Sequence, residues 1–306
     1  MKSRYIYGLV VVLALLPWAL GSQYVFHIAT MIAIMMPMAL ALNLMLKIGQ
    51  LSLAHPAFMG IGAYGSALLV IRLGFPPILA LGVSALIAAV IASLAGSVFL
   101  RIKGVYFVLL TYAFGQIINL VFQEWTSLFG GNNGLYGIPK FSILGLRLTS
   151  VQNYYVLGLI FASLFFAAMR AIERSDIGAI FQSLNENEML SRSIGSNAHA
   201  WRIAAFTFSA FVAAISGGIY AFYIGFLSPD AFGFRLSVDM IVINAIGGAN
   251  TVLGPLLGAI FIVPLPEMLR DARQYQLLIY GLCLMVFLIF CRQGLVSLIQ
   301  PKKRAV

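Results

Sequence analysis

The feature that most constrains this chain is a series of apolar runs, each roughly twenty residues long, separated by short polar segments. A helix of that length crosses the hydrocarbon core of a bilayer. Of the 306 residues, 61% are hydrophobic and only 9% are charged, which excludes a soluble globular domain. We therefore predict an all-α, polytopic transmembrane bundle that forms a single domain over residues 1–306.

The apolar pattern predicts about eight clean spans. They cover residues 5–20, 24–46, 51–73, 76–100, 105–123, 151–169, 203–224 and 277–291. The segment from Ser237 to Pro266 is also apolar, but Gly247-Gly248-Ala249-Asn250 divides it. It adds up to two short helices, so the range is about eight to ten spans.

Basic residues decide how this divided segment runs, because Lys and Arg gather on the cytoplasmic side of a membrane. With Lys2 and Arg4 inside, the basic tail at residues 302–304 is also inside only if the segment enters and returns. We predict a broken-helix hairpin near residues 237–266, either re-entrant or made of two tilted spans, and both termini in the cytoplasm. Gly254 and Gly258 form a GxxxG pair for close packing, and Gly247 and Gly248 form the turn.

A glycine pattern occurs in the third apolar run, where Gly60, Gly62 and Gly65 match the spacing of a dinucleotide-binding fingerprint. No strand precedes them and the segment lies in a predicted span, so we set the nucleotide interpretation aside. With Ser66, these glycines form a small-residue face suited to helix packing.

Three polar residues inside predicted spans are candidates for a substrate pathway. His55 precedes Pro56, where a break in the helix is tolerated only against protein or a water-filled path. The alternative role for His55 is a structural cap. Gln116 and Asn119 share one helix face, and they either line a path or tie helices together.

A polar segment from Ile172 to Arg202 interrupts the apolar pattern and is predicted to be a cytoplasmic loop. Ile177, Ile180, Phe181 and Leu184 recur at helical spacing in it. This stripe is narrow, which suits the groove of a partner protein better than a hydrophobic core. A solvated acidic surface is the alternative interpretation of the loop.

Several classes of function are excluded or disfavoured. The chain has no Walker A motif and no hydrolase or zinc-protease motif. Cys283 and Cys291 are about 12 Å apart along a helix, too far for a disulfide. The net charge of +10 reflects basic span ends rather than nucleic-acid binding. Asp239 and Glu124 lie near predicted span ends, and no mid-span ionisable residue supports an ion-coupled carrier, which remains the rival class.

The chain resembles the branched-chain amino acid ABC transporter permeases, specifically their LivM-type subunit. The resemblance runs in order from about residue 40 to residue 296. It is carried by residues 52–58, 62–64, 101–107, 111, 114, 130–134, 137–139, 185–188, 195, 197, 209–210, 228–229, 232, 247–248, 254–255, 258–259 and 294–295.

The resemblance implies an inner-membrane importer subunit that works by alternating access. Its partners would be a second, LivH-like permease subunit, two ATPase subunits and a periplasmic or extracellular solute-binding protein. ATP would bind those ATPases, and this chain would hold no cofactor or metal. The polar segment would be the coupling element, carried by Gly178, Glu186, Asn187, Glu188 and Gly195.

The resemblance is incomplete in two places, the coupling element and the turn of the hairpin. Where the family usually carries Arg in the coupling element, this chain has Ala179, Gln182 and Asn185. The turn at Ala249-Asn250 also departs from the family pattern. The resemblance implies a branched-chain or hydrophobic amino acid as the solute. Because of these departures, urea, a short amide or another small polar solute is the alternative.

Overall fold

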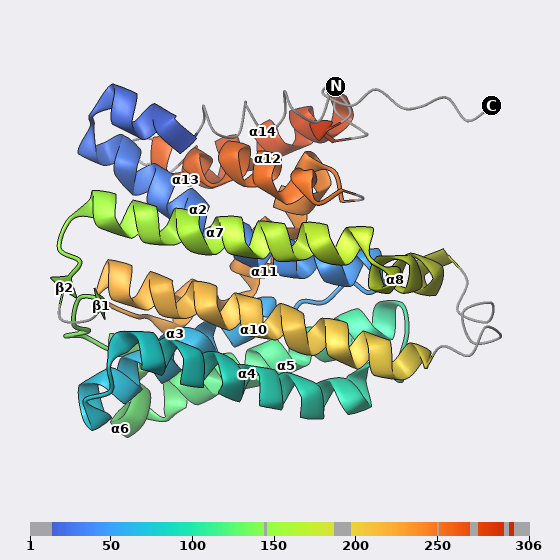
Figure 1. Ribbon diagram of the computed structural model, residues 1–306, viewed down its shortest axis with the longest axis horizontal. Helices are drawn as coiled ribbons and strands as arrows, with labels where there is room; N and C mark the ends of the chain where they lie inside the picture. Colours follow the sequence, from blue (N-terminus) through green and yellow to red (C-terminus); the bar gives the residue numbers. More distant parts are fainter. Residues whose placement is uncertain are drawn as a thin grey trace.

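The computed structural model describes residues 14–143, 146–186, 197–249, 251–269, 275–290 and 294–296. The described chain is helical apart from short connections and one antiparallel pair of two-residue strands, β1 (Ser142–Ile143) and β2 (Leu146–Arg147). Long helices lie side by side along one direction (Figure 1). The expected all-α bundle is therefore correct.

Six of the described helices are long and apolar enough to cross a membrane. They are α2 (Gln23–Lys47), α3 (His55–Leu73), α4 (Pro77–Phe99), α5 (Val105–Glu124), α7 (Val151–Arg174) and α10 (Ala198–Ile224). The first expected span lies mostly outside the described residues, with residues 14–20 helical. The last is α14 (Gln276–Phe290), with 15 residues. Six spans are thus supported, and the expected count of about eight stays a prediction.

The centre of the bundle is formed by α2, α3 and α10. The most apolar windows of α2 and α10 are each 67% buried, against 33% for α4 and α7 and 22% for α5. Small residues let α3 and α10 approach closely: a Cβ on Gly62 would lie 2.0 Å from the carbonyl oxygen of Ala214, and one on Gly217 would lie 1.9 Å from that of Met59. Larger side chains there would force the two backbones apart.

The divided segment forms a hairpin of α11 (Phe234–Gly247) and α12 (Leu253–Ile262), continued by α13 (Pro264–Met268). A Cβ on Gly247 would lie 1.8 Å from the carbonyl oxygen of Gly254, and one on Gly258 would lie 1.9 Å from that of Ile243. Gly248 ends α11 with a φ of 114°, which favours glycine. The two helices are therefore in backbone contact from Ile243 of α11 to the turn.

An irregular segment leads from α10 into this hairpin. Leu227 pairs with Leu135 at the end of the bundle where α10 finishes, and the short helix η2 (Pro229–Phe232) follows. Within the bundle, the Asn119 side chain donates a hydrogen bond of 2.7 Å to the carbonyl oxygen of Pro229. Non-helical backbone at membrane depth needs such partners because no water is available there.

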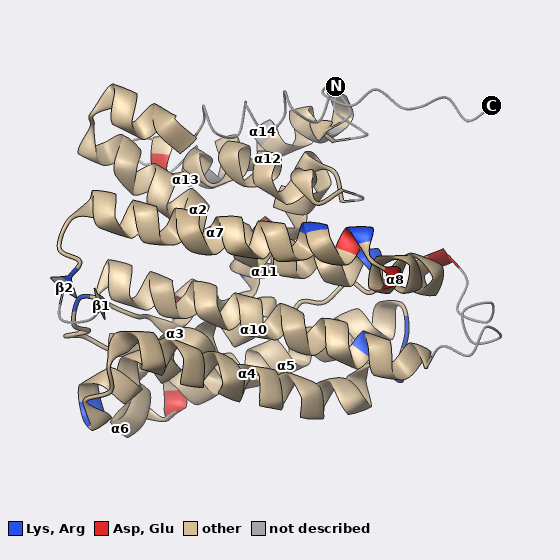
Figure 2. Cartoon of the chain, in the orientation of Figure 1, with Lys and Arg blue, Asp and Glu red and all other residues tan. Residues whose placement is uncertain are grey.

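The two ends of the bundle differ in charge (Figure 2). At one end lies α8 (Asp176–Glu186), and we call this the α8 end. It carries basic residues at or near helix termini: Lys47, Arg101, Lys103, Arg170, Arg174 and Arg202. The opposite end carries α6 (Thr126–Phe129), η1 (Gly131–Asn133) and the strands, with fewer basic residues among the described ones: Arg72, Lys140 and Arg147.

Candidate functional site

The candidate site is the corner where α7 turns into α8. Only Ser175 separates the two helices, and its hydroxyl donates to the carbonyl oxygen of Ile172 at 2.8 Å. A Cβ on Gly178 would lie 2.5 Å from that oxygen and 2.7 Å from the carbonyl oxygen of Glu173. Any side chain at position 178 would thus open the corner, which explains why glycine stands there.

A small ionic network joins this corner to the end of α2. The Lys47 ammonium lies 2.7 Å from one carboxylate oxygen of Glu173, and the Arg170 guanidinium lies 3.1 Å from the other. These side chains are between 18% and 30% exposed, so the pairs contribute only about 0.2–1 kcal/mol each. The network therefore links α2 to α7 but contributes little to the stability of the fold.

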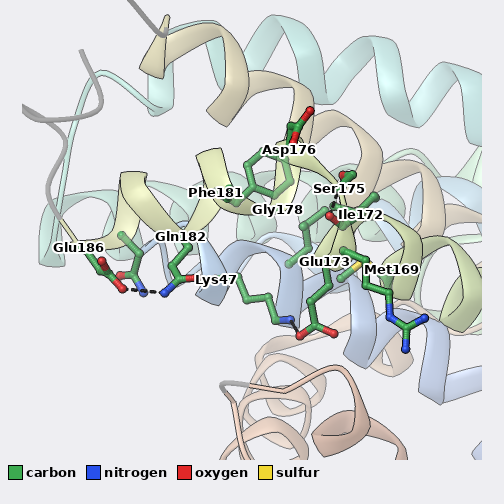
Figure 3. Close-up of a pocket in the computed structure, with 14 residues that line it drawn as sticks. Lys47, Met169, Ile172, Glu173, Ser175, Asp176, Gly178, Phe181, Gln182 and Glu186 are labelled. Atoms are coloured by element: carbon green, nitrogen blue, oxygen red, sulfur yellow. Dashed lines mark hydrogen bonds and ion pairs between the residues drawn. The ribbon is translucent and has the colours of Figure 1, made fainter. Parts of the chain in front are cut away.

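A hollow of about 680 Å³ lies between the end of α2, the end of α7 and one side of α8. Figure 3 shows Lys47 and Glu173 on one wall and Gln182 and Glu186 along α8. The Gln182 amide donates to the Glu186 carboxylate at 2.8 Å. The lining is therefore largely polar and charged, as expected for a surface that meets water or a protein.

The structure corrects the expected role of the apolar stripe on α8. Phe181 and Leu184 are buried, and Ile177 and Ile180 pack against the same core. The Phe181 ring meets Trp201 of α10 edge to face, with centroids 6.2 Å apart. The stripe holds α8 against its own bundle because a short helix needs an apolar face to stay folded. A partner would instead meet the polar side of α8.

The described parts of the segment from Ile172 to Arg202 are largely helical. The structure continues α7 to Arg174 and starts α10 at Ala198, with Asn197 capping α10 through its side chain. Of the five expected coupling residues, Gly178 lies at the corner and Glu186 lies at the other end of α8; both line the hollow. Asn187, Glu188 and Gly195 lie outside the described residues.

The three expected pathway residues do not converge on one site. The His55 ring is buried at the start of α3, nearest the backbone of Ser52 and Ala41, and neither ring nitrogen has well-formed hydrogen-bond geometry. Asn119 is buried and accepts a hydrogen bond of 2.7 Å from Gln123. Gln116 is only half-buried on α5. Asn119 thus supports η2, while Gln116 lies nearer the outside.

The glycines of α3 face three different neighbours. A Cβ on Gly60 would lie 2.6 Å from the Phe122 ring, and one on Gly65 would lie 3.0 Å from the Cβ of Ser84. Gly62 faces α10, as described above. The single small-residue face inferred from the sequence is therefore spread around the helix, because α3 is enclosed by α4, α5 and α10.

Sequence reasoning missed a pair of buried amides that ties the hairpin to α2. The Asn43 amide donates to Asn244 at 3.0 Å and to the carbonyl oxygen of Ala249 at 2.8 Å. The Asn244 amide donates to the carbonyl oxygen of Ala39 at 3.0 Å. The available signal was one asparagine within each of two apolar runs, since such residues must find partners in the bundle.

Comparison with known proteins shows the family of this chain. The profile of the family described as "Branched-chain amino acid transport system / permease component" matches residues 24–290. The chain belongs to this permease family. It is 29% identical over 305 residues to the high-affinity branched-chain amino acid transport system permease protein LivM of Escherichia coli K12, covering 92% of this chain and 72% of that protein.

Other relatives widen the range of solutes. LivM of Salmonella typhimurium is 28% identical, with 98% of this chain and 76% of that protein covered. The autoinducer 2 import system permease protein LsrC of Klebsiella pneumoniae is 28% identical over 148 residues, which cover 46% of this chain and 42% of that protein. No solved structure matches. The permease is a multi-pass integral membrane protein of an importer family.

The departures at Ala179, Gln182 and Asn185 fall together in the structure of this permease. All three positions line the hollow, one helical turn apart along α8. Glu173 lines the same hollow.

Proposed function

We propose that this chain is one of two transmembrane subunits of an ABC importer in the bacterial inner membrane. The imported solute is a branched-chain or other hydrophobic amino acid. ATP binds to and is hydrolysed by separate ATPase subunits, and this chain supplies no nucleotide site. The bundle alternates between states open to either side of the membrane.

The observation that carries the proposal is the short connection between α8 and the membrane helices. Ser175 alone links α8 to α7, Gly178 keeps their backbones in contact, and Lys47 joins α2 through Glu173. A force on α8 therefore reaches two of the candidate spans without passing through a flexible loop. Rigid elements packed in this way can carry energy between distant sites.

The polar side of α8 is the proposed ATPase contact. Gln182, Asn185 and Glu186 are exposed there, and a carboxylate accepts strong hydrogen bonds from basic groups on a partner. Asn187, Glu188 and Gly195 extend this contact in our proposal. A solute-binding protein docks at the opposite end, and a second permease subunit pairs with this chain in the membrane.

The distribution of charge supports the proposed orientation. The α8 end carries more basic residues than the opposite end among the described residues, and basic residues collect on the cytoplasmic side. This orientation places α8 where ATP is available. We further propose, from the basic residues near both ends of the sequence, that both termini are cytoplasmic.

Affinity purification of the tagged chain from native membranes tests the assembly. We expect the ATPase subunits and the second permease to co-purify with it. The double charge reversal Glu186→Lys with Glu188→Lys removes the carboxylates that would accept hydrogen bonds, so it should reduce both ATPase recovery and uptake of leucine. The matched control is Glu124→Lys at the opposite end, which should leave ATPase recovery unchanged.

Two outcomes would contradict the proposal. One is full ATPase recovery and full uptake in the Glu186/Glu188 double variant. The other is accumulation of leucine against a gradient by the chain alone in vesicles, which would favour an ion-coupled carrier.

A neutral solute is the second candidate, because part of the chain is similar to permeases named for autoinducer 2. Urea and short amides belong to the same alternative. Competition of labelled leucine uptake by an excess of each neutral compound separates the solutes. An amino acid importer should show no competition.

A further inference from the structure

One outward face of the bundle differs from the others, and we call it the α5–α11 face. On α5 it exposes Tyr112, Ile117 and Leu120 with half-buried Gln116. On α11 it exposes Phe234, Arg235 and Val238 with half-exposed Asp239. The Tyr112 and Phe234 rings join the two helices, with centroids 5.2 Å apart.

The charged residues of this face lie at membrane depth. Helix α5 has 20 residues and is therefore about 30 Å long, and Tyr112 is about 10 Å from its start. Phe234 lies beside Tyr112, so the adjacent Arg235 lies at a similar depth. Hydrogen bonds that lead to α5 support this depth for α11. The Ser237 hydroxyl donates to the carbonyl oxygen of Leu53 at 3.0 Å, and the Leu53 N–H donates to the Thr111 hydroxyl of α5 at 3.1 Å.

This placement corrects the expectation that Asp239 lies near a span end. Helix α11 begins inside the bundle, where the segment after α10 delivers it, rather than at the membrane surface. An exposed arginine and a carboxylate at this depth are costly against lipid. The α5–α11 face must therefore meet water or protein.

The two charges are neighbours on α11 but form no close ion pair. Arg235 and Asp239 are one helical turn apart on one side of α11, and no ion pair within 4.0 Å joins them in the described structure. The Tyr280 hydroxyl donates to the Asp239 carboxylate at 2.8 Å. Among the described residues, Arg235 makes no hydrogen bond or ion pair. A cation and an anion are therefore presented side by side with two aromatic rings.

We propose that the α5–α11 face lines the solute route, and that Arg235 and Asp239 bind the carboxylate and the ammonium of a free amino acid there. Tyr112 and Phe234 contact its apolar side chain. This inference rests on the proposed function and names the solute class at a site. A guanidinium pairs well with a carboxylate, whereas a neutral sugar-like solute or an amide gives neither charge a counter-ion.

Cysteine labelling in the assembled complex tests the route. Both native cysteines are replaced by serine, and cysteine is introduced by Val238→Cys or Gln116→Cys on the proposed face. Val90→Cys, on the aliphatic outer face of α4, is the matched control. A charged, membrane-impermeant thiol reagent should modify positions 238 and 116 at least about tenfold faster than position 90, because only the first two contact water. Equal rates would overturn the inference.

Protection of position 238 tests the ligand. Leucine should slow its modification, while leucinamide, isovalerate and ribose should not, because each lacks one or both charges. Adding Arg235→Gln should raise the leucine concentration for half-protection by about tenfold or more, and Arg235→Lys should retain protection. Equal protection by ribose, or unchanged protection after Arg235→Gln, would overturn the site.

ATPase co-purification separates the two proposals. If the ATPase subunits are absent from the complex, the proposed function fails. If they are present and leucine protection is insensitive to Arg235→Gln, only the amino acid site fails.

Discussion

The outer face of α4 and the α5–α11 face are both exposed in the isolated chain, yet their chemistry differs. Helix α4 exposes only aliphatic side chains along its length: Ile78, Leu79, Val83, Leu86, Ile87, Val90, Leu94 and Val98. The α5–α11 face exposes aromatic, amide and charged groups instead. Exposure in a membrane protein therefore has two meanings: an aliphatic face matches lipid, and a polar face at the same depth indicates water or a partner.

The largest expected effect comes from placing a charge on each face. Val90→Arg puts a guanidinium near the middle of α4 in lipid, which costs about 2.5–3.5 kcal/mol on insertion-based scales. Val238→Arg on α11 should cost much less, because that face already accommodates Arg235 and Asp239. The measurement is the amount of assembled complex in the membrane. A similar loss for both variants would contradict the distinction between the faces.

Glycine contacts of the hairpin set the position of α11. Gly258→Ala would place a Cβ 1.9 Å from the carbonyl oxygen of Ile243, so α11 and α12 must separate. We expect a loss of about 1–3 kcal/mol in stability, measured by denaturant unfolding of the complex. Labelling of a cysteine at position 238 should change, while labelling at position 90 should not.

The control for that variant is Gly82→Ala on α4, where nothing lies within 4 Å of the added Cβ. It should be neutral or stabilising by about 0.5–1 kcal/mol, because alanine favours a helix over glycine. Equal stability of the two variants would show that the hairpin is not closely packed.

The buried amides of Asn43 and Asn244 also help to hold α11 in position, because they join it to α2. Asn244→Ala leaves the Asn43 amide with one fewer partner and removes the bond to Ala39. Leaving buried polar groups unpaired should cost about 1–3 kcal/mol. Asn153→Ala, at an exposed position on α7, is the control and should stay within about 0.5 kcal/mol of the parent. A thermal-shift assay of the complex is sufficient.

The smallest effect is expected at the α7–α8 corner. A double-mutant cycle with Lys47→Met and Glu173→Gln should give a coupling energy of about 0.2–1 kcal/mol, because both side chains are partly exposed. Cysteine labelling on both faces should be unchanged. A coupling energy well above this range would mean that the corner, too, is shielded from water.

Much of the fold could be predicted from the sequence. Apolar runs place α2, α3, α4, α5, α7 and α10 within a few residues of their observed bounds, because length and hydrophobicity decide whether a helix can span a bilayer. The hairpin followed from Gly247-Gly248 and from the basic tail. The start of α11 could not be predicted, since hydropathy does not show that the preceding segment descends into the bundle before the helix begins.

The candidate site was predicted less well. From the sequence, Gly178 and Glu186 were predicted to lie in or beside a short helix. The apolar stripe of α8 was predicted to contact a partner protein, whereas it packs against its own bundle. A stripe has the same spacing whether it packs on its own chain or on another. Likewise, Asn43 and Asn244 are more than two hundred residues apart, and only the folded bundle brings their amides within 3.0 Å.

The sequence by itself determined that this chain is a helical membrane protein of a permease family, because apolar length and an ordered series of motifs are properties of the chain. Only the tertiary structure decided which polar residues share a surface. The proposed role of Arg235 and Asp239 depends on the depth at which α11 starts. That depth is set by contacts of α11 with α5 and by the preceding segment η2. Local sequence cannot encode depth, since it depends on how distant segments pack.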